Sequence, residues 1–429
     1  MKTVVKNIVA ENIEVTRLPN GLRVATEQVP GARAVSLGVW VDVGARDEAP
    51  AVQGASHFLE HMLFKGTERR SATDIALSVD RVGGYMNAST GYEATGFEMM
   101  VPATALSMAT SLLADVLVAP SFRDEDTEAE RLVILEELRG CLDQPEDVID
   151  TRLTETLFAD HGLGLEVLGN VESLADMSPD GLRAFHNEWY RPNNMVVAAA
   201  GAVDHDEIVA QLGRVLDDQE PGKAPVRLAP KPLSSSMLRL TGATEQIHLR
   251  LGFRSLPDAH DDTVALGIAN HVLGRGPASR LFQEVREVRG LAYSVWSDTT
   301  SYVDSGEFTV NTAVAPQRFE EALEVIEQCV ADCRDTGITA EEFERARESR
   351  RGGLMMGLQT TTSRMYRLVG ELLVHDRIIP YEEEFAELEA LTVDDANRAI
   401  HAVLSGPRVT AVMRPATGQA ALINGYPDS

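Results

Sequence analysis

Two histidines and a glutamate stand close together in an otherwise apolar segment of the chain. His57 and His61 lie four positions apart, and Glu60 directly precedes the second histidine. Residues four apart share one face of a helix, so both imidazoles can reach a common point. Two neutral imidazoles can hold Zn²⁺, and a nearby carboxylate can take a proton from water that the metal activates. This spacing therefore predicts half of a catalytic metal site, with Glu60 as its general base.

A simpler interpretation makes these three residues the polar rim of a core helix. The residues between and beside them, such as Phe58 and Leu59, are apolar and can bury such a helix. However, the order His-x-x-Glu-His is the zincin signature reversed, and its chance occurrence in a chain of this kind is on the order of one per cent. The metal site is the favoured hypothesis.

A catalytic zinc site needs a third protein ligand and an open position for water. An acidic segment at 125–138 has helical character and offers Glu130, Glu136 and Glu137. Such glutamates commonly form the solvated face of a helix. Spacing alone does not choose among the three.

The surrounding pattern predicts a mixture of helices and strands. Residues 14–27 have the pattern of a strand, an Asn-Gly turn and a second strand, which is typical of a hairpin. Apolar residues with helical spacing occupy about 55–64, 72–82, 103–118 and 125–143, and strand-like alternation covers 84–101. The expected fold class is α+β, with mixed or antiparallel sheets flanked by helices.

The chain also contains an internal repeat. Residues 60–66 match residues 270–276 in pattern, and the acidic helix near 125–137 has a counterpart near 340–351. In the second copy, Gly267 replaces His57 and Asn270 replaces Glu60. We therefore expect two similar halves, of which only the first retains the chemistry.

A proline-rich segment separates the two copies. Residues 221–236 contain four prolines among small and polar residues, which favours a semi-rigid linker. The predicted organisation is a zinc-bearing domain at 1–220, a linker at 221–236, and a homologous domain without the zinc motif at 237–429.

Composition limits the partners. The formal net charge of −27 argues against nucleic acid and anionic membrane surfaces, and it modestly favours basic peptides. The sequence contains no apolar run long enough for a membrane span, so we expect no membrane insertion. The N-terminal segment lacks the features of a secretion signal. The expected location is the bacterial cytoplasm, or the mitochondrial matrix if a presequence has been removed.

The run from His57 to Thr67 resembles the signature of the pitrilysin and mitochondrial processing peptidase family, the inverzincins. In that family, the third zinc ligand is a glutamate in a later helix of the type Glu-Arg-x-Val-Ile-x-x-Glu, and residues 130–137 match this pattern. The resemblance implies that Glu137 is a ligand. It also implies that Glu130 is an accessory carboxylate that orients the ligands.

The resemblance extends over most of the chain. Residues 83–90 resemble the segment that enters the family's cleft-lining strand, which implies that Asn87 and Ala88 contact substrate. The alternation near 87–100 is compatible with an exposed edge that pairs with a peptide and equally with an internal strand. Residues 279–295 resemble the region carrying the family's arginine and tyrosine, here Arg286 and Tyr293. The family often has a longer glycine run where this chain has 274–277.

In two-subunit members of this family, two chains enclose a chamber, and the arginine and tyrosine face the zinc across it. Because this chain carries both parts, the resemblance predicts a homodimer with shared sites, and a heterodimer with a related subunit is the alternative. The expected function is a zinc metalloendopeptidase acting on peptides or on unfolded, presequence-like segments.

Two other functions compete with the peptidase. The family also includes non-catalytic scaffold and assembly subunits, which have no physical need for His57, Glu60, His61 and Glu137 together. A protein that only stores or carries zinc would not need Glu60. The four residues favour the enzyme.

Overall fold

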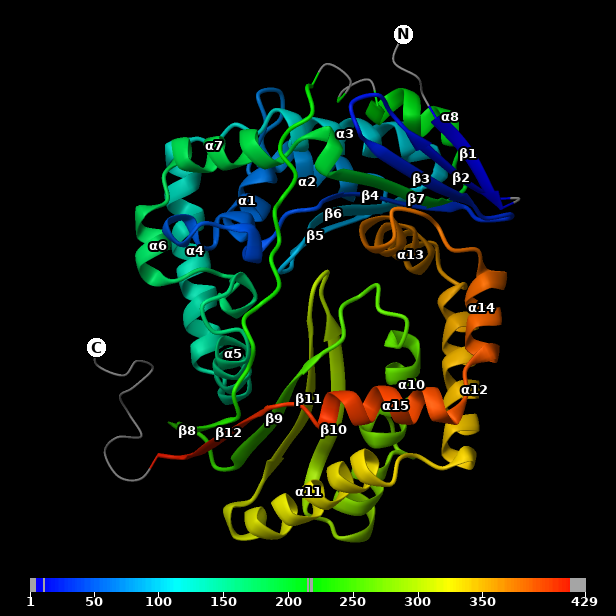
Figure 1. Ribbon diagram of the computed structural model, residues 1–429. Coiled ribbons are helices and arrows are strands. Elements are labelled where there is room, and N and C mark those ends of the chain that lie inside the picture. Colours follow the sequence, from blue (N-terminus) through cyan, green and yellow to red (C-terminus); the bar gives the residue numbers. More distant parts are fainter. Residues whose placement is uncertain (1–4, 11, 214–215, 217–218, 417–429) are drawn as a thin grey trace. The chain divides into compact units, whose positions relative to one another are not determined.

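The computed structural model describes residues 5–10, 12–213, 216 and 219–416. These residues form two compact units, each built on one sheet (Figure 1). The first unit contains residues up to 136, 165–226 and 354–381, and the second contains 137–164, 227–353 and those from 382 onwards. In the described part of the chain, none of the helices combines the length and apolar character that a membrane span requires.

The first unit is a seven-stranded sheet in the order β1-β2-β3-β7-β4-β6-β5. Its strands are β1 (Val5–Ala10), β2 (Ile13–Arg17), β3 (Arg23–Gln28), β4 (Ala34–Val41), β5 (Tyr85–Thr90), β6 (Thr95–Pro102) and β7 (Met195–Gly201). β2 and β3 pair antiparallel, so the predicted hairpin is confirmed. Every residue of the Val- and Ala-rich strand β7 is buried, as expected for a central strand covered on both faces.

Helices cover both faces of this sheet (Figure 1). The helices of this unit are α1 (Ala55–Leu63), α2 (Ala72–Asp80), α3 (Leu106–Val118), most of α4 (Asp124–Leu142), α6 (Val171–Asp176), α7 (Pro179–Trp189), α8 (His205–Ile208) and α13 (Thr361–Val374). The helices predicted near 55–64, 72–82, 103–118 and 125–143 are confirmed. A reciprocal capping box between Ser71 and Asp74 fixes where α2 begins.

The second unit contains a five-stranded sheet in the order β10-β11-β9-β12-β8. Its strands are β8 (Ser236–Gly242), β9 (Ile247–Ser255), β10 (Ala292–Ser301), β11 (Gly306–Val314) and β12 (Arg408–Pro415). Its helices are α5 (Pro145–Leu157), α10 (Thr263–Gly274), α11 (Phe319–Asp335), most of α12 (Ala340–Gly357), most of α14 (Tyr381–Ala390) and α15 (Val393–Leu404).

The two sheets share one topology. In the first, β3 and β7 are parallel, and the neighbours from β7 through β4 and β6 to β5 are antiparallel. In the second, β8 and β12 are parallel, and the order β12, β9, β11, β10 is antiparallel throughout. The first sheet adds only β1 and β2. The predicted α+β fold with two similar halves is confirmed.

Each sheet receives one helix from the other half of the sequence. α5 packs on β9 and β12 of the second sheet, whereas α13 packs on β3, β4 and β7 of the first. Leu368 of α13 is fully buried in a cluster with β7 residues, including Ala198. The compact units therefore differ from the ranges 1–220, 221–236 and 237–429 expected from the sequence. Those ranges divide the chain only in sequence order.

Candidate metal centre

Helix α1 positions the paired histidines. Gly54 precedes it with a φ of 88°, and a Cβ there would lie 2.8 Å from the Leu168 carbonyl oxygen. Only glycine suits this position. The buried carboxylate of Glu48 accepts hydrogen bonds from the backbone N–H groups of Gly54 and Ser56, at 2.6 and 2.7 Å. The start of α1 is thus positioned by its close approach to the Leu168 backbone and by its hydrogen bonds to Glu48.

The apolar residues of α1 face the core and leave the histidines together. Phe58, Leu59 and Met62 are buried, and the imidazole centroids of His57 and His61 lie 4.7 Å apart. Burial, and to a lesser extent the neighbouring His61, lowers the pKa of His57 to about 4. His57 is therefore neutral near pH 7, which is the form that binds a metal.

The third member of the group comes from α4. One ligand atom from each of His57, His61 and Glu137 can be chosen so that all lie within 4.8 Å of one another. Within the described residues, this is the only such group of three or more histidine, cysteine or acidic side chains. Two imidazoles and a carboxylate are a donor set typical of catalytic zinc sites, so these residues fit the ion that the sequence predicts.

Glu130 lies two helical turns before Glu137 on α4 and contacts His61. Its buried carboxylate lies 3.0 Å from Nδ1 of His61 and 2.6 Å from Nζ of Lys65. A carboxylate only accepts hydrogen bonds, so this contact favours a proton on Nδ1 and leaves Nε2 of His61 as the donor to a metal. This geometry agrees with the accessory position expected for Glu130.

Glu60 projects from the same helix toward the end of strand β5. The Thr90 hydroxyl donates a hydrogen bond to Glu60 Oε2 at 2.6 Å. The buried Tyr190 lies near enough to be affected, because burial first and then the charges of Glu60 and Glu48 raise its pKa. Glu60 is half-buried and held in place by a strand residue.

Strand β5 is the edge of the first sheet and, among the residues that the structure describes, pairs only with β6. The exposed edge predicted from the alternation is therefore confirmed, and the alternative of an internal strand is wrong. Asn87 is exposed and Ala88 is half-buried, as the two faces of an edge strand require. Their contact with substrate stays a prediction.

Arg286 and Tyr293 lie together in the second unit. Arg286 belongs to the π-helical segment η7 (Phe282–Val288), and Tyr293 lies near the start of β10. The Arg286 guanidinium carbon is 4.7 Å from the ring centroids of both Phe282 and Tyr293. Tyr293 is 80% exposed, so its hydroxyl is available to a ligand. Cation–π contact explains the pairing of the two side chains.

The second copy of the motif, on α10, keeps the contact between helix and strand but lacks the set of residues that would bind a metal. The Ser297 hydroxyl of β10 donates to Asn270 Oδ1 at 2.6 Å, as the Thr90 hydroxyl donates to Glu60 in the first unit. Asn270 is buried, and Gly267 offers no side chain where His57 stands. The second unit therefore repeats the helix–strand contact but not the site.

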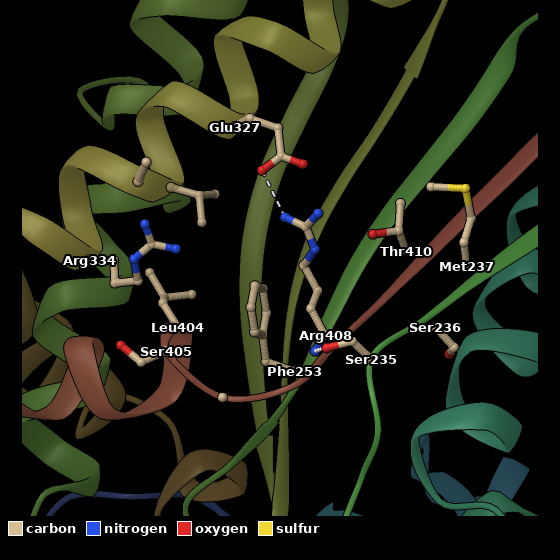
Figure 2. A pocket seen from close by; sticks show the side chains of 13 residues that line it. Ser235, Ser236, Met237, Phe253, Glu327, Arg334, Leu404, Ser405, Arg408 and Thr410 are labelled. Carbon is tan, nitrogen blue, oxygen red and sulfur yellow. Dashed lines mark hydrogen bonds and ion pairs between the residues drawn. The ribbon is translucent and has the colours of Figure 1, made fainter.

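A separate cavity of about 790 Å³ lies within the second unit (Figure 2). Its arginines are already paired, because Arg408 donates to Glu327 at 2.7 Å and Arg334 bonds to Asp335 at 2.7 Å. Figure 2 shows Arg408 directed toward Glu327 across the cavity. None of the residues predicted for the site lines it.

Three residues that contact the site, or the start of the helix that carries it, were not predicted from the sequence. Glu48 precedes α1 in an irregular segment without periodic pattern, and nothing in the sequence connects it to the helix. Lys65 comes two residues after the end of α1, and Thr90 ends β5, so their closeness to the motif and to the predicted strand could have suggested them. The contacts of all three depend on tertiary folding.

The fold and the His-His-Glu group together define a zinc protein of the reversed zincin class. Residues 23–171 match the family model described as insulinase (peptidase family M16), and residues 176–350 match the model described as the peptidase M16 inactive domain. The chain belongs to peptidase family M16, the pitrilysin family. The family predicted from the motifs is confirmed.

Relatives support this assignment along nearly the whole chain. A Mycobacterium leprae protein named an uncharacterized zinc protease is 40% identical over 407 residues, which cover 93% of this chain and 91% of the relative. A Bacillus subtilis protein of the same description is 34% identical over 396 residues, covering 92% of this chain and 97% of that protein. The predicted zinc cofactor agrees with these names and with the His-His-Glu group.

Solved structures support the fold. A protease from Helicobacter pylori superimposes with a TM-score of 0.88 at 21% identity, covering 94% of this chain and 99% of that one. A Pseudomonas fluorescens structure titled a peptidase M16 inactive domain gives a TM-score of 0.88 at 20% identity, with 95% and 99% coverage. At these identities the likeness concerns the fold alone.

Proposed function

We propose that this protein is a zinc metalloendopeptidase that hydrolyses extended peptides or unfolded, presequence-like segments. The observation that carries the proposal is the convergence of His57, His61 and Glu137, whose ligand atoms lie within 4.8 Å, with Glu60 on the same helix as the histidines. A scaffold subunit would have no need for this combination. The peptidase is therefore favoured over the non-catalytic alternative.

The mechanism assigns one role to each residue. A zinc ion held by His57, His61 and Glu137 would polarise the peptide carbonyl and make water acidic enough to attack near neutral pH. Glu60 takes the proton from the attacking water and delivers it to the amine that leaves when the C–N bond breaks. The hydrogen bond from Thr90 orients the Glu60 carboxylate for both transfers.

Substrate is held as an added strand. The exposed edge of β5, with Asn87 and Ala88, offers backbone N–H and C=O groups that pair with an extended peptide. Such pairing depends little on sequence, so it suits an enzyme that accepts many peptides. Arg286 and Tyr293 are proposed to stabilise the oxyanion and grip the peptide backbone.

The assembly is proposed to be a homodimer that encloses the substrate in a chamber, with the heterodimer as the alternative. Each site would combine zinc residues from one subunit with Arg286 and Tyr293 from the other. The net charge of −27 supports a preference for basic peptides in such a chamber. A cytoplasmic location remains a prediction.

Cleavage of a fluorogenic peptide with basic residues tests this function, with zinc-loaded wild type compared to Glu60→Gln. We expect Glu60→Gln to retain zinc and to lose roughly 10²- to 10⁴-fold in kcat, since it cannot accept the proton. The exposed Glu68→Gln variant, with the same charge change, should match wild type. Equal cleavage by wild type and Glu60→Gln would refute the mechanism.

A further inference from the structure

The two faces of the first sheet differ beside its edge strand. Cross-strand pairing places Tyr85 beside Met100, and Asn87 beside Glu98, on the face that carries α13. The opposite face packs on α1 and α3. Tyr85 is 54% exposed and Met100 is 43% exposed. Next to the proposed peptide strand, the α13 face is therefore left partly open.

Glu98 is a buried carboxylate within this open region. It is 9% exposed, and its Oε2 atom has no hydrogen-bond partner among the described residues. Burial, followed by a hydrogen bond to Glu98, raises the pKa of Tyr366 on α13 to about 12. The Tyr366 hydroxyl therefore keeps its proton near neutral pH and lies close to Glu98. Glu98 still retains an oxygen that is unsatisfied in the protein alone, and such an oxygen costs free energy.

Aromatic rings form the walls around this carboxylate. The Trp40 ring lies over Gly38 and Gly96, where an added Cβ would come within 2.4 and 2.3 Å of its atoms. Gly38 is also the residue opposite Glu98 on β4. The Tyr366 ring packs against Trp40 with centroids 5.5 Å apart, and Tyr366 is 44% exposed. These aromatic faces are well suited to a cation.

The spacing of the strands determines how long a peptide side chain must be to reach Glu98. Strands lie about 4.8 Å apart, so a peptide strand added to β5 would run about 9.6 Å from β6, with Asn87 between it and Glu98. A peptide side chain on this face must cross Asn87 to reach the carboxylate. Lysine and arginine are long enough, and their aliphatic stems can lie against Tyr85 while the charged head reaches inward.

We propose that Glu98, lined by Tyr366 and Tyr85, is a subsite that selects a lysine or arginine side chain of the peptide paired with β5. This inference rests on the proposed function and specifies its substrate class at one residue position. An aliphatic side chain would cover the same surface but would leave Oε2 of Glu98 unpaired. The aliphatic stem of a basic side chain covers the aromatic surface, and its charged head pairs with the Glu98 carboxylate.

The test uses two sets of fluorogenic peptides of one neutral sequence. Each peptide of the first set carries a single arginine at a different position, and the second set carries citrulline, which has nearly the same shape without the charge. We expect arginine at one position to raise kcat/KM about tenfold over citrulline in wild type and in Glu68→Gln. In Glu98→Gln the ratio should fall below about twofold, mainly because kcat/KM for the arginine peptide falls.

An unchanged arginine preference in Glu98→Gln, or no preference at any position in wild type, would overturn the subsite. A second measurement separates this outcome from failure of the peptidase proposal. The same peptides, labelled for fluorescence anisotropy, are titrated onto Glu60→Gln and onto Glu60→Gln with Glu98→Gln. Tighter binding of the arginine peptide by the first protein alone supports the subsite even if no peptide is cleaved. Equal binding by both proteins contradicts it.

Discussion

The side chains around the histidine pair keep it ready for a metal. Burial holds His57 neutral, and Glu130 contacts Nδ1 of His61 at 3.0 Å. The pattern His-x-x-Glu-His was enough to predict the two imidazoles and Glu60, because helical geometry fixes their relation. Helix spacing left Glu130, Glu136 and Glu137 open. That choice depended on the family resemblance, since the approach of α4 to α1 is a tertiary contact.

Glu130→Gln should weaken zinc binding while leaving the ligands in place. The neutral amide is a poorer acceptor from His61 and loses the ion pair with Lys65, so we expect a dissociation constant roughly 10- to 100-fold higher. Titration against a competing chelator measures it. Glu128→Gln is the matched control on the exposed face of the same helix. Equal zinc affinity in both variants would remove Glu130 from the site.

Glu48 should give the metal-free protein a pH-dependent stability. Burial raises the pKa of Glu48 from its ordinary value of 4.5 to about 7, against the lowering effect of its backbone hydrogen bonds. Between these two pKa values the folded chain keeps a proton that the unfolded chain has released. Stability therefore falls as pH rises through the window. Glu48→Gln lacks this dependence and should gain up to about 3 kcal/mol on wild type across it.

Urea denaturation with a chelator present, at the two ends of that window, measures the difference. Glu68→Gln, exposed to solvent, should follow wild type at both pH values. If the free energy of unfolding of Glu48→Gln changed with pH as much as that of wild type, the prediction would be wrong. Glu48 would then have the same pKa in the folded and unfolded chains.

At the scale of elements, the local sequence predicted most of the helices and strands of the first unit, whereas it predicted only part of the metal site. Periodicity located the hairpin at 14–27 and the first four long helices, because each alternates between core and solvent at its own period. The repeat at 60–66 and 270–276 indicated the shared topology. The sequence could not predict that α5 packs on the second sheet and α13 on the first. The residues of a helix do not indicate which of two sheets it covers.

This exchange predicts which sheet a helix substitution loosens. Leu368→Ala in α13 should cost about 2 to 5 kcal/mol through its buried cluster. It should lower hydrogen-exchange protection in β7, although β7 belongs to the other half of the sequence. Leu153→Ala in α5 is the reciprocal variant, since Leu153 is buried near Gly252 of β9. Loss of protection in β9 and β12 from Leu368→Ala would contradict this packing.

At the scale of the whole molecule, the family resemblance carried the prediction. Without it, Arg286 and Tyr293 have no visible relation to the histidines, which lie more than two hundred residues earlier. The structure brings these two side chains together. Composition contributed only the acidic charge, which bears on partners rather than on fold.

Mixing two inactive variants tests the shared site of the proposed dimer. Glu60→Gln damages the zinc-binding half of a shared site, and Tyr293→Phe damages the half that the other subunit supplies. A mixed dimer would therefore hold one intact site. Random exchange of subunits should then restore about a quarter of wild-type activity. A mixture of Glu60→Gln with Glu137→Gln, which affect the same contribution, should restore none. Absence of recovery between properly dimeric proteins would refute the shared site.

The most direct test of the zinc centre compares the neighbouring variants Glu137→Gln and Glu136→Gln. They change the charge of α4 equally, but only Glu137 belongs to the group with His57 and His61. Zinc content of the purified proteins is the measurement. Glu136→Gln should retain about one zinc per chain, as in wild type, and Glu137→Gln should have lost most of it. Equal zinc content in the two variants would contradict the centre described here.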